Sequence, residues 1–216
     1  MQHVLIFGAN GKVGRILTDK LDIDPDFTPT AVIRDKEQRA HFEDRGIKTR
    51  LGDLESSVEA LTKLMNGMDA IVFTAGSGGS TGAEKTLTVD LDGALKTMEA
   101  AEAAGVRRYV MVSALNAGTR EGWEDSPIRP YYVAKHVADR ILTESSLNYT
   151  ILRPGRLLDD LGTGMITTED PAKSQGVARE DVAELALQSL RNDTTIRKVI
   201  EFNEGDTPIR DVVEGL

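Results

Sequence analysis

Cysteine is absent from this chain of 216 residues, which excludes disulfides, thiolate nucleophiles and cysteine metal ligands. Histidine is scarce as well. His3, His41 and His136 lie far apart in the sequence, so we do not expect a histidine metal site. No apolar run approaches the roughly 18 residues that a membrane span requires, so we expect no membrane partner.

Positive charge is also in short supply, since 26 Lys and Arg face 35 Asp and Glu for a formal net charge of −9. A chain of this charge does not attract phosphodiesters through its overall field, which disfavours a nucleic-acid partner. An anionic ligand must therefore be held by local groups. The first apolar run begins within three residues of Met1, and this position leaves no room for a signal peptide. We expect a cytoplasmic protein that acts on a small molecule.

Short β-branched runs alternate with longer helical patterns along the chain, which predicts βαβ units and a parallel sheet. The expected fold is one α/β domain over residues 1–216, a Rossmann-type doubly wound sheet of about seven strands with a small C-terminal substrate-side lobe. The predicted strands are His3–Phe7, Thr28–Arg34, Ile47–Leu51, Ala70–Ala75, Tyr109–Ser113, Tyr149–Arg153 and Val199–Phe202. The predicted helices are Lys12–Leu21, Lys36–Arg45, Glu55–Asn66, Glu84–Ala104, Tyr131–Ser145, Glu180–Arg191 and Ile209–Glu214.

Two polar loops interrupt this alternation, at residues 116–130 and 156–177. Each follows a predicted strand, so both emerge at the edge of the sheet where α/β folds bind ligands. Trp123, the single tryptophan, lies in the first loop. It either covers a substrate or packs the loop onto the body of the domain.

The first predicted strand ends in three glycines spaced by three, Gly8, Gly11 and Gly14. Gly8 permits a sharp turn, Gly11 lets a diphosphate approach the backbone, and Gly14 allows close packing of the helix that follows. That helix directs its free N–H groups and its positive dipole end toward the anion. The alternative is a purely structural glycine turn. With the glycines, Asn10, Lys12 and Val13 are the predicted dinucleotide-binding residues of this turn.

The end of the second predicted strand should meet the adenosine ribose of a bound dinucleotide. Arg34 stands there, where an NAD-selective site usually offers a carboxylate, and an arginine suits the 2′-phosphate of NADP. In the alternative, Asp35 binds the ribose hydroxyls and Arg34 lies on the surface, so NAD is also possible. We expect NADP.

Two further segments follow strands on the cofactor side. Asp53 and Leu54 follow the third predicted strand, and Asp53 either caps the next helix or accepts a hydrogen bond from the adenine amino group. Ala75 and Gly76 follow the fourth strand. They are small enough for the backbone to pass close to a cofactor, or they only begin a flexible loop.

Candidate catalytic residues follow the fifth strand. Ser113 ends that strand, and Tyr131 and Lys135 are four residues apart on a predicted helix, so they share one face. This set suits carbonyl reduction. The Tyr131 hydroxyl would donate a proton, Lys135 would lower the pKa of that tyrosine and hold the ribose hydroxyls, and Ser113 would hydrogen-bond the substrate carbonyl. Tyr132 competes with Tyr131 for the donor role.

Taken together, these motifs resemble the atypical short-chain dehydrogenase/reductases, closest to the NmrA-like, biliverdin/flavin-reductase-like and epimerase-like groups. The resemblance implies a Rossmann sheet, NADP(H), and a nicotinamide near Ser113, Tyr131, Lys135 and Pro154, with Pro154 and Gly155 turning the sixth strand beside it. The matching residues are Gly8-x-x-Gly11-x-x-Gly14, Gly52-Asp53-Leu54, Ser113, Tyr131-x-x-x-Lys135, Ala138-Asp139, Arg153-Pro154-Gly155, Gly162-Thr163-Gly164 and Arg179-Glu180-Asp181.

Three functions are compatible with this pattern. The first is an NADP(H)-dependent oxidoreductase that reduces a carbonyl or a conjugated, flavin-like acceptor. The second is a non-catalytic NADP(H) sensor of the NmrA type. The third is a sugar-nucleotide epimerase or dehydratase, which is disfavoured because residues 156–216 leave little chain for the C-terminal lobe that such enzymes need. Either a monomer or a homodimer fits the sequence.

Overall fold

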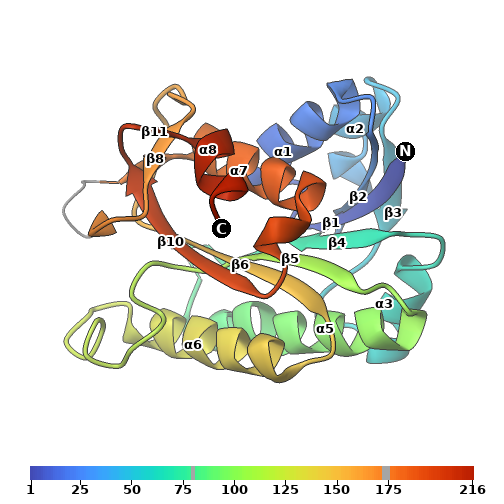
Figure 1. The fold of residues 1–216 in the computed structure, drawn as a ribbon. Helices are drawn as coiled ribbons and strands as arrows, with labels where there is room; N and C mark the ends of the chain where they lie inside the picture. Colours follow the sequence, from blue (N-terminus) through green and yellow to red (C-terminus); the bar gives the residue numbers. More distant parts are fainter. Residues whose placement is uncertain (79–80, 172–175) are drawn as a thin grey trace.

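The computed structural model describes residues 1–78, 81–171 and 176–216, and these residues form three layers with a twisted sheet in the middle (Figure 1). Seven parallel strands run in the order β3-β2-β1-β4-β5-β6-β10. The predicted Rossmann-type sheet is therefore confirmed. The seven strands are β1 (Gln2–Phe7), β2 (Phe27–Ile33), β3 (Lys48–Leu51), β4 (Ala70–Phe73), β5 (Arg108–Val112), β6 (Asn148–Pro154) and β10 (Lys198–Glu204).

Four short strands were not predicted. The antiparallel strands β8 (Met165–Thr167) and β11 (Thr207–Pro208) extend the main sheet to nine strands, and β7 (Leu157–Leu158) pairs with β9 (Val177–Ala178). Pieces of two or three residues are too short to carry a readable alternation. All four lie C-terminal to β6, in the part of the chain for which the sequence predicts a small substrate-side lobe.

Helices cover both faces of the sheet. Figure 1 shows α1 (Lys12–Ile23), α7 (Arg179–Arg191) and α8 (Ile209–Glu214) on one face and α3 (Val58–Leu64), α5 (Asp92–Ala104) and α6 (Arg129–Glu144) on the other. Strand β1 explains why, because Val4 and Ile6 join one hydrophobic core and Leu5 and Phe7 the other. A strand buried on both faces is a continuous apolar run, which is the signal that the sequence displays.

Three predicted helices differ from the structure. The expected helix Glu84–Ala104 is divided into α4 (Ala83–Lys85), a π-helical segment η2 (Thr86–Leu91) and α5. The expected helix Lys36–Arg45 is a 3-10 turn, η1 (Lys36–Gln38), followed by the four-residue α2 (Ala40–Glu43). The expected helix Glu55–Asn66 begins only at Val58, because Ser57 and not Asp53 accepts the capping hydrogen bond, from Ala60 N–H. Asp53 Oδ1 instead accepts from Glu55 N–H within a turn.

Trp123 packs the loop over residues 116–130 onto the domain. Its side chain is buried, and its ring centroid lies 6.0 Å from that of His136 on α6. His136 Nδ1 in turn bonds the carbonyl oxygen of Ala117 at 2.7 Å. Of the two predicted roles for this tryptophan, packing is the one that the structure supports.

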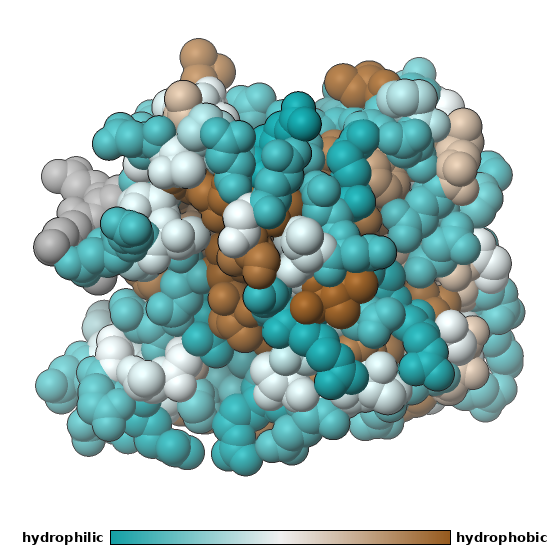
Figure 2. All heavy atoms as spheres, viewed as in Figure 1, coloured by the Kyte–Doolittle hydropathy of each residue, from teal (hydrophilic) through white to brown (hydrophobic). Residues whose placement is uncertain are grey.

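The surface is mostly hydrophilic in the view of Figure 2, with hydrophobic side chains gathered near the centre of that face. Figure 1 places α7 and α8 over this region, in front of the sheet. A further helix of type 3-10, η4 (Asp193–Thr195), leads from α7 into β10. Across the described ranges, none of the helices combines the length and the apolar character that crossing a bilayer demands.

Candidate active site

The glycine turn after β1 has the geometry that the sequence predicts. Gly8 adopts φ +80, and a Cβ atom there would lie 2.5 Å from the backbone nitrogen of Ala75. A Cβ atom on Gly14 would collide with the Gly8 carbonyl oxygen and lie 2.8 Å from the Cα atom of Ala9. The turn closes through a hydrogen bond of 2.9 Å from Gly11 N–H to Gly8 O. Glycine at positions 8 and 14 is therefore a steric requirement of the turn.

Helix α1 begins directly at this turn without a side-chain cap. The first backbone N–H groups of such a helix have no partner within the helix and can bind an anion. Lys12 and Val13 begin the helix and line a cavity together with Gly11. Asn10 does not line it, because its Oδ1 accepts hydrogen bonds from the Arg15 guanidinium at 2.6 and 3.2 Å.

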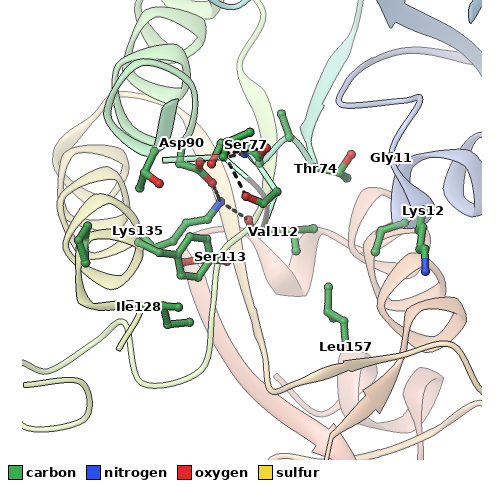
Figure 3. Close-up of a pocket in the computed structure, with 18 of the residues that line it drawn as sticks. Gly11, Lys12, Thr74, Ser77, Asp90, Val112, Ser113, Ile128, Lys135 and Leu157 are labelled. Carbon is green, nitrogen blue, oxygen red and sulfur yellow. Dashed lines mark hydrogen bonds and ion pairs between the residues drawn. The ribbon is translucent and has the colours of Figure 1, made fainter. Parts of the chain in front are cut away.

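The cavity has a volume of about 730 Å³, within the range usual for ligand sites. It opens where β1, β4 and β5 end, which is the switch point of a doubly wound sheet. Figure 3 shows side chains entering it from several elements. Its described lining residues are Gly11, Lys12, Val13, Thr74, Ala75, Gly76, Ser77, Gly78, Thr81, Ala83, Thr86, Asp90, Val112, Ser113, Pro127, Ile128, Pro130, Tyr131, Lys135, Leu157 and Arg179.

All three predicted catalytic residues line this cavity. Ser113 lies one residue beyond β5, Tyr131 on the first turn of α6, and Lys135 one turn later. Lys135 Nζ donates to the Val112 carbonyl oxygen at 3.3 Å and lies 5.6 Å from the centre of the Tyr131 ring. Tyr132 contacts the Tyr131 ring but lies outside the cavity, so Tyr131 is the donor candidate.

A buried carboxylate that the sequence reasoning missed faces the lysine. Asp90 is 1% exposed, and its Oδ1 lies 3.8 Å from Lys135 Nζ. Its Oδ2 accepts a hydrogen bond of 2.9 Å from Ser77 N–H. Asp90 belongs to the π-helical segment η2, and such segments are frequent at functional sites. An aspartate among Leu87, Val89 and Leu91 was the available signal.

A second buried carboxylate lies on α6 itself, one helical turn after Lys135. Asp139 is 1% exposed and accepts a hydrogen bond of 2.8 Å from Arg153 Nε, and Arg153 also binds Glu201 at 2.9 Å. Burial raises the pKa of Asp139, and Arg153, Ser113 and Lys135 oppose that increase. Arg153 on β6 is therefore an ion-pairing residue of that strand. The buried Ser113 Oγ lies close enough to Asp139 to influence its pKa, although among the described residues it makes no hydrogen bond that meets strict geometry.

The pKa of Tyr131 differs from the expectation. We expected Lys135 to lower the pKa of Tyr131, but burial raises the pKa of this half-buried tyrosine, with the Asp90 carboxylate adding to the increase. Burial lowers the pKa of Lys135, against the opposing effect of Asp90 and Asp139. Tyr131 therefore keeps its proton at neutral pH and is suited to donate it.

Other predicted residues lie outside the cavity lining. Arg34 is exposed at the end of β2, with its Nε atom 3.5 Å from Asp35 Oδ2. Leu54 packs against the core beside α5, and Asp53 holds the turn before α3. These residues follow β2 and β3, and their predicted contacts with an adenosine stay predictions.

Pro154 and Gly155 lie outside the lining as well. The Pro154 carbonyl oxygen accepts from Leu115 N–H at 2.7 Å, and Gly155 N–H donates to Phe202 O at 3.1 Å. A Cβ atom on Gly155 would overlap the Asn203 side chain. Their contacts in this structure tie β6 to its neighbours, and their predicted contact with nicotinamide stays a prediction.

The residues at the turn fit a dinucleotide, because Gly8 and Gly14 leave no room for side chains and the helix start presents free N–H groups. Comparisons with known proteins also indicate a dinucleotide-binding chain. The model of a family described as NAD(P)H-binding matches residues 8–193. YhfK of Bacillus subtilis, named an uncharacterized sugar epimerase, is 46% identical over 213 residues, which are 99% of both chains.

Two solved structures share the fold over nearly their whole length. A Bacillus halodurans protein, named as an NAD-dependent epimerase/dehydratase, has a TM-score of 0.93 at 38% identity and covers 100% of both chains. The Lactococcus lactis protein ylbE, named an oxidoreductase, has a TM-score of 0.90 at 35% identity, over 99% of this chain and 96% of the other. The resemblance to atypical short-chain dehydrogenase/reductases is therefore confirmed.

Proposed function

Because the chain belongs to the NAD(P)H-binding family, we propose that it is an NADP(H)-dependent oxidoreductase that reduces a carbonyl or a conjugated, flavin-like acceptor. The observation that carries this proposal is the meeting of Ser113, Tyr131 and Lys135 with the glycine turn in a single cavity. The bound dinucleotide would be held by the turn at Gly11 and by Lys12 and Val13, and it supplies the hydride.

The chain's own residues would handle the proton. Tyr131 holds its proton because its pKa is raised, so it can deliver that proton to the alkoxide that develops on a reduced carbonyl. The Ser113 hydroxyl would donate to the same oxygen and stabilise its charge. Lys135, between the carboxylates of Asp90 and Asp139, would hold the ribose hydroxyls and add positive charge beside the reacting atoms.

The choice of NADP over NAD rests on Arg34. Its guanidinium is about two thirds exposed, and within the described parts of the chain its one ion pair is a long contact with the adjacent Asp35. An exposed guanidinium at the end of the second strand is placed to bind a 2′-phosphate. We propose NADP as the preferred cofactor on this ground.

The names of two similar proteins point to a sugar epimerase or dehydratase as the second candidate. The arrangement of the C-terminal residues argues against a nucleotide-sugar substrate. Strand β10 joins the main sheet beside β6, and α7 packs against α1. These elements complete the main domain, so the described residues beyond β6 contribute only short strands and α8 toward a separate substrate lobe. We therefore keep the reductase as the proposal, acting on a small molecule in the cytoplasm as a monomer or homodimer.

Substitution Tyr131→Phe tests the proposal, with Tyr132→Phe as the matched control. NADPH consumption would be measured with a panel of ketones, aldehydes, quinones and free flavin, and NADPH affinity by calorimetry. For carbonyl acceptors we expect Tyr131→Phe to lower turnover about 10²- to 10⁴-fold without loss of NADPH binding, and Tyr132→Phe to act like the wild type.

The other outcomes are equally informative. A flavin accepts hydride without a side-chain proton donor, so an activity confined to flavin would change little in Tyr131→Phe. NADPH binding without turnover of any acceptor would contradict the oxidoreductase and favour the sensor.

A further inference from the structure

Two cations of the cavity lining, Lys12 and Arg179, contact the same carboxylate, that of Asp159. Lys12 is the first residue of α1 and Arg179 the first residue of α7. Asp159 Oδ2 lies 2.6 Å from Lys12 Nζ, and Asp159 Oδ1 lies 2.6 Å from Arg179 Nη1. A single anion thus bridges two cations that both line the cavity. Figure 3 shows Lys12 on the side of the cavity away from Lys135.

The packing of the two helices brings these cations together. Helices α1 and α7 lie side by side on the same face of the sheet. Among the residues with described placement, Asp159 is the one ion-pair partner of Lys12 and of Arg179. If Asp159 moved away, two positive charges would stand beside the glycine turn without an ion-pair partner among the described residues.

Asp159 can leave without releasing the rest of its loop. The residues that come after Asp159 in the loop are held by hydrogen bonds to side chains of α7. Gly162 N–H donates to Glu180 Oε2 at 3.0 Å, and Thr163 and Gly164 N–H donate to the carboxylate of Asp181 at 3.1 and 2.8 Å. Asp181 is 2% exposed, whereas the Asp159 side chain is 64% exposed. The carboxylate of Asp181 that holds the loop is therefore buried, whereas the ion pairs of Asp159 are exposed to solvent and to competing anions.

We propose that Lys12 and Arg179 form a subsite for the diphosphate of the dinucleotide, and that Asp159 is a built-in competitor which the diphosphate displaces. The inference rests on the proposed function, since the ligand is its cofactor. Lys12 directly follows Gly11 in the turn, so the subsite adjoins the free N–H groups of α1. A diphosphate carries two negative charges against the single charge of Asp159, and it satisfies both cations at once.

Substitution Asp159→Asn tests the competitor, with Asp160→Asn as the control that removes an equal charge from the neighbouring exposed residue. Calorimetry would give the Kd values for NAD, NADP and adenosine 2′,5′-bisphosphate. We expect Asp159→Asn to tighten NAD and NADP equally, by about 2- to 30-fold, which is the range that two exposed ion pairs correspond to. Adenosine 2′,5′-bisphosphate carries a single 5′-phosphate in place of the diphosphate and should gain less than the dinucleotides do.

Substitution Arg179→Gln tests the subsite itself. We expect it to weaken NAD and NADP to a similar degree, and to do so in the Asp159→Asn background as well. A gain that Asp160→Asn shares would refute the proposal, and so would a gain confined to NADP, which would assign the cations to the 2′-phosphate. Equal Kd values for Arg179→Gln and the wild type would also refute it. Dinucleotide binding by the wild type with no effect of these substitutions overturns this inference alone. A wild type that binds neither dinucleotide overturns the proposed function too.

Discussion

Substitution of Gly8 by alanine probes the turn on which the cofactor site depends. Gly8 has φ +80, and its added Cβ atom would lie 2.5 and 2.6 Å from the N and Cα atoms of Ala75. A left-handed conformation costs an alanine about 1–2 kcal/mol. The obstructing atoms are backbone at the end of β4, which cannot rotate away, and such overpacking costs about 1–3 kcal/mol more. We therefore expect Gly8→Ala to lower the free energy of unfolding by about 2–5 kcal/mol.

Gly46 offers the matched control. It also has φ +80, but a Cβ atom there would meet nothing within 4 Å. Gly46→Ala should therefore show only the conformational cost of about 1–2 kcal/mol. Urea unfolding followed by the fluorescence of Trp123, which is buried in the native state, would measure both variants. The difference between them isolates the steric contribution at the turn.

Binding completes the test. Gly8→Ala should lose affinity for NADP under conditions where it is still folded, because the turn must shift to admit the methyl group. Gly46→Ala should bind NADP as the wild type does. Equal unfolding free energies for the two variants, or unchanged NADP affinity in folded Gly8→Ala, would refute the packing of Gly8 against β4 as the basis of the site.

The parts of the fold that the sequence predicts are those set by local patterns. The central strands β1, β4 and β5 are readable because burial on both faces makes them nearly continuous apolar runs. The glycine turn is readable because backbone geometry at Gly8 and Gly14 admits no side chain. Ser113, Tyr131 and Lys135 are readable by their residue types and by the helical spacing of the last two, and the structure places all three in one cavity.

The parts that could not be predicted depend on contacts between distant segments. A π-helical turn has nearly the same apolar pattern as an α-helix, so the interruption at Thr86–Leu91 leaves no periodic signal. The apolar neighbours of Asp90 are a signal of burial, but its contact with Lys135 depends on the packing of α6 and is not visible in the sequence. Arg179 reaches the cavity only because α7 packs against α1. The capping alternative for Asp53 fails for a local reason, since both Asp53 and Ser57 are good capping residues and the chain uses the later one.

Two further substitutions address cofactor choice and proton donation. Arg34→Ala should raise the Kd for NADP about 10- to 150-fold and leave NAD nearly unchanged, because a charge-assisted bond to a 2′-phosphate contributes about 1.5–3 kcal/mol. Unchanged NADP affinity by calorimetry would place Arg34 among ordinary surface residues. Asp90→Asn should move the alkaline limb of the pH profile for carbonyl reduction to lower pH. The limb moves in this direction because the Asp90 carboxylate raises the pKa of both Tyr131 and Lys135. Without that carboxylate, both side chains lose their protons at a lower pH. Asp92→Asn, at an exposed position on the adjoining helix, should leave the profile in place, and a limb that stays fixed or moves upward in Asp90→Asn would contradict this coupling.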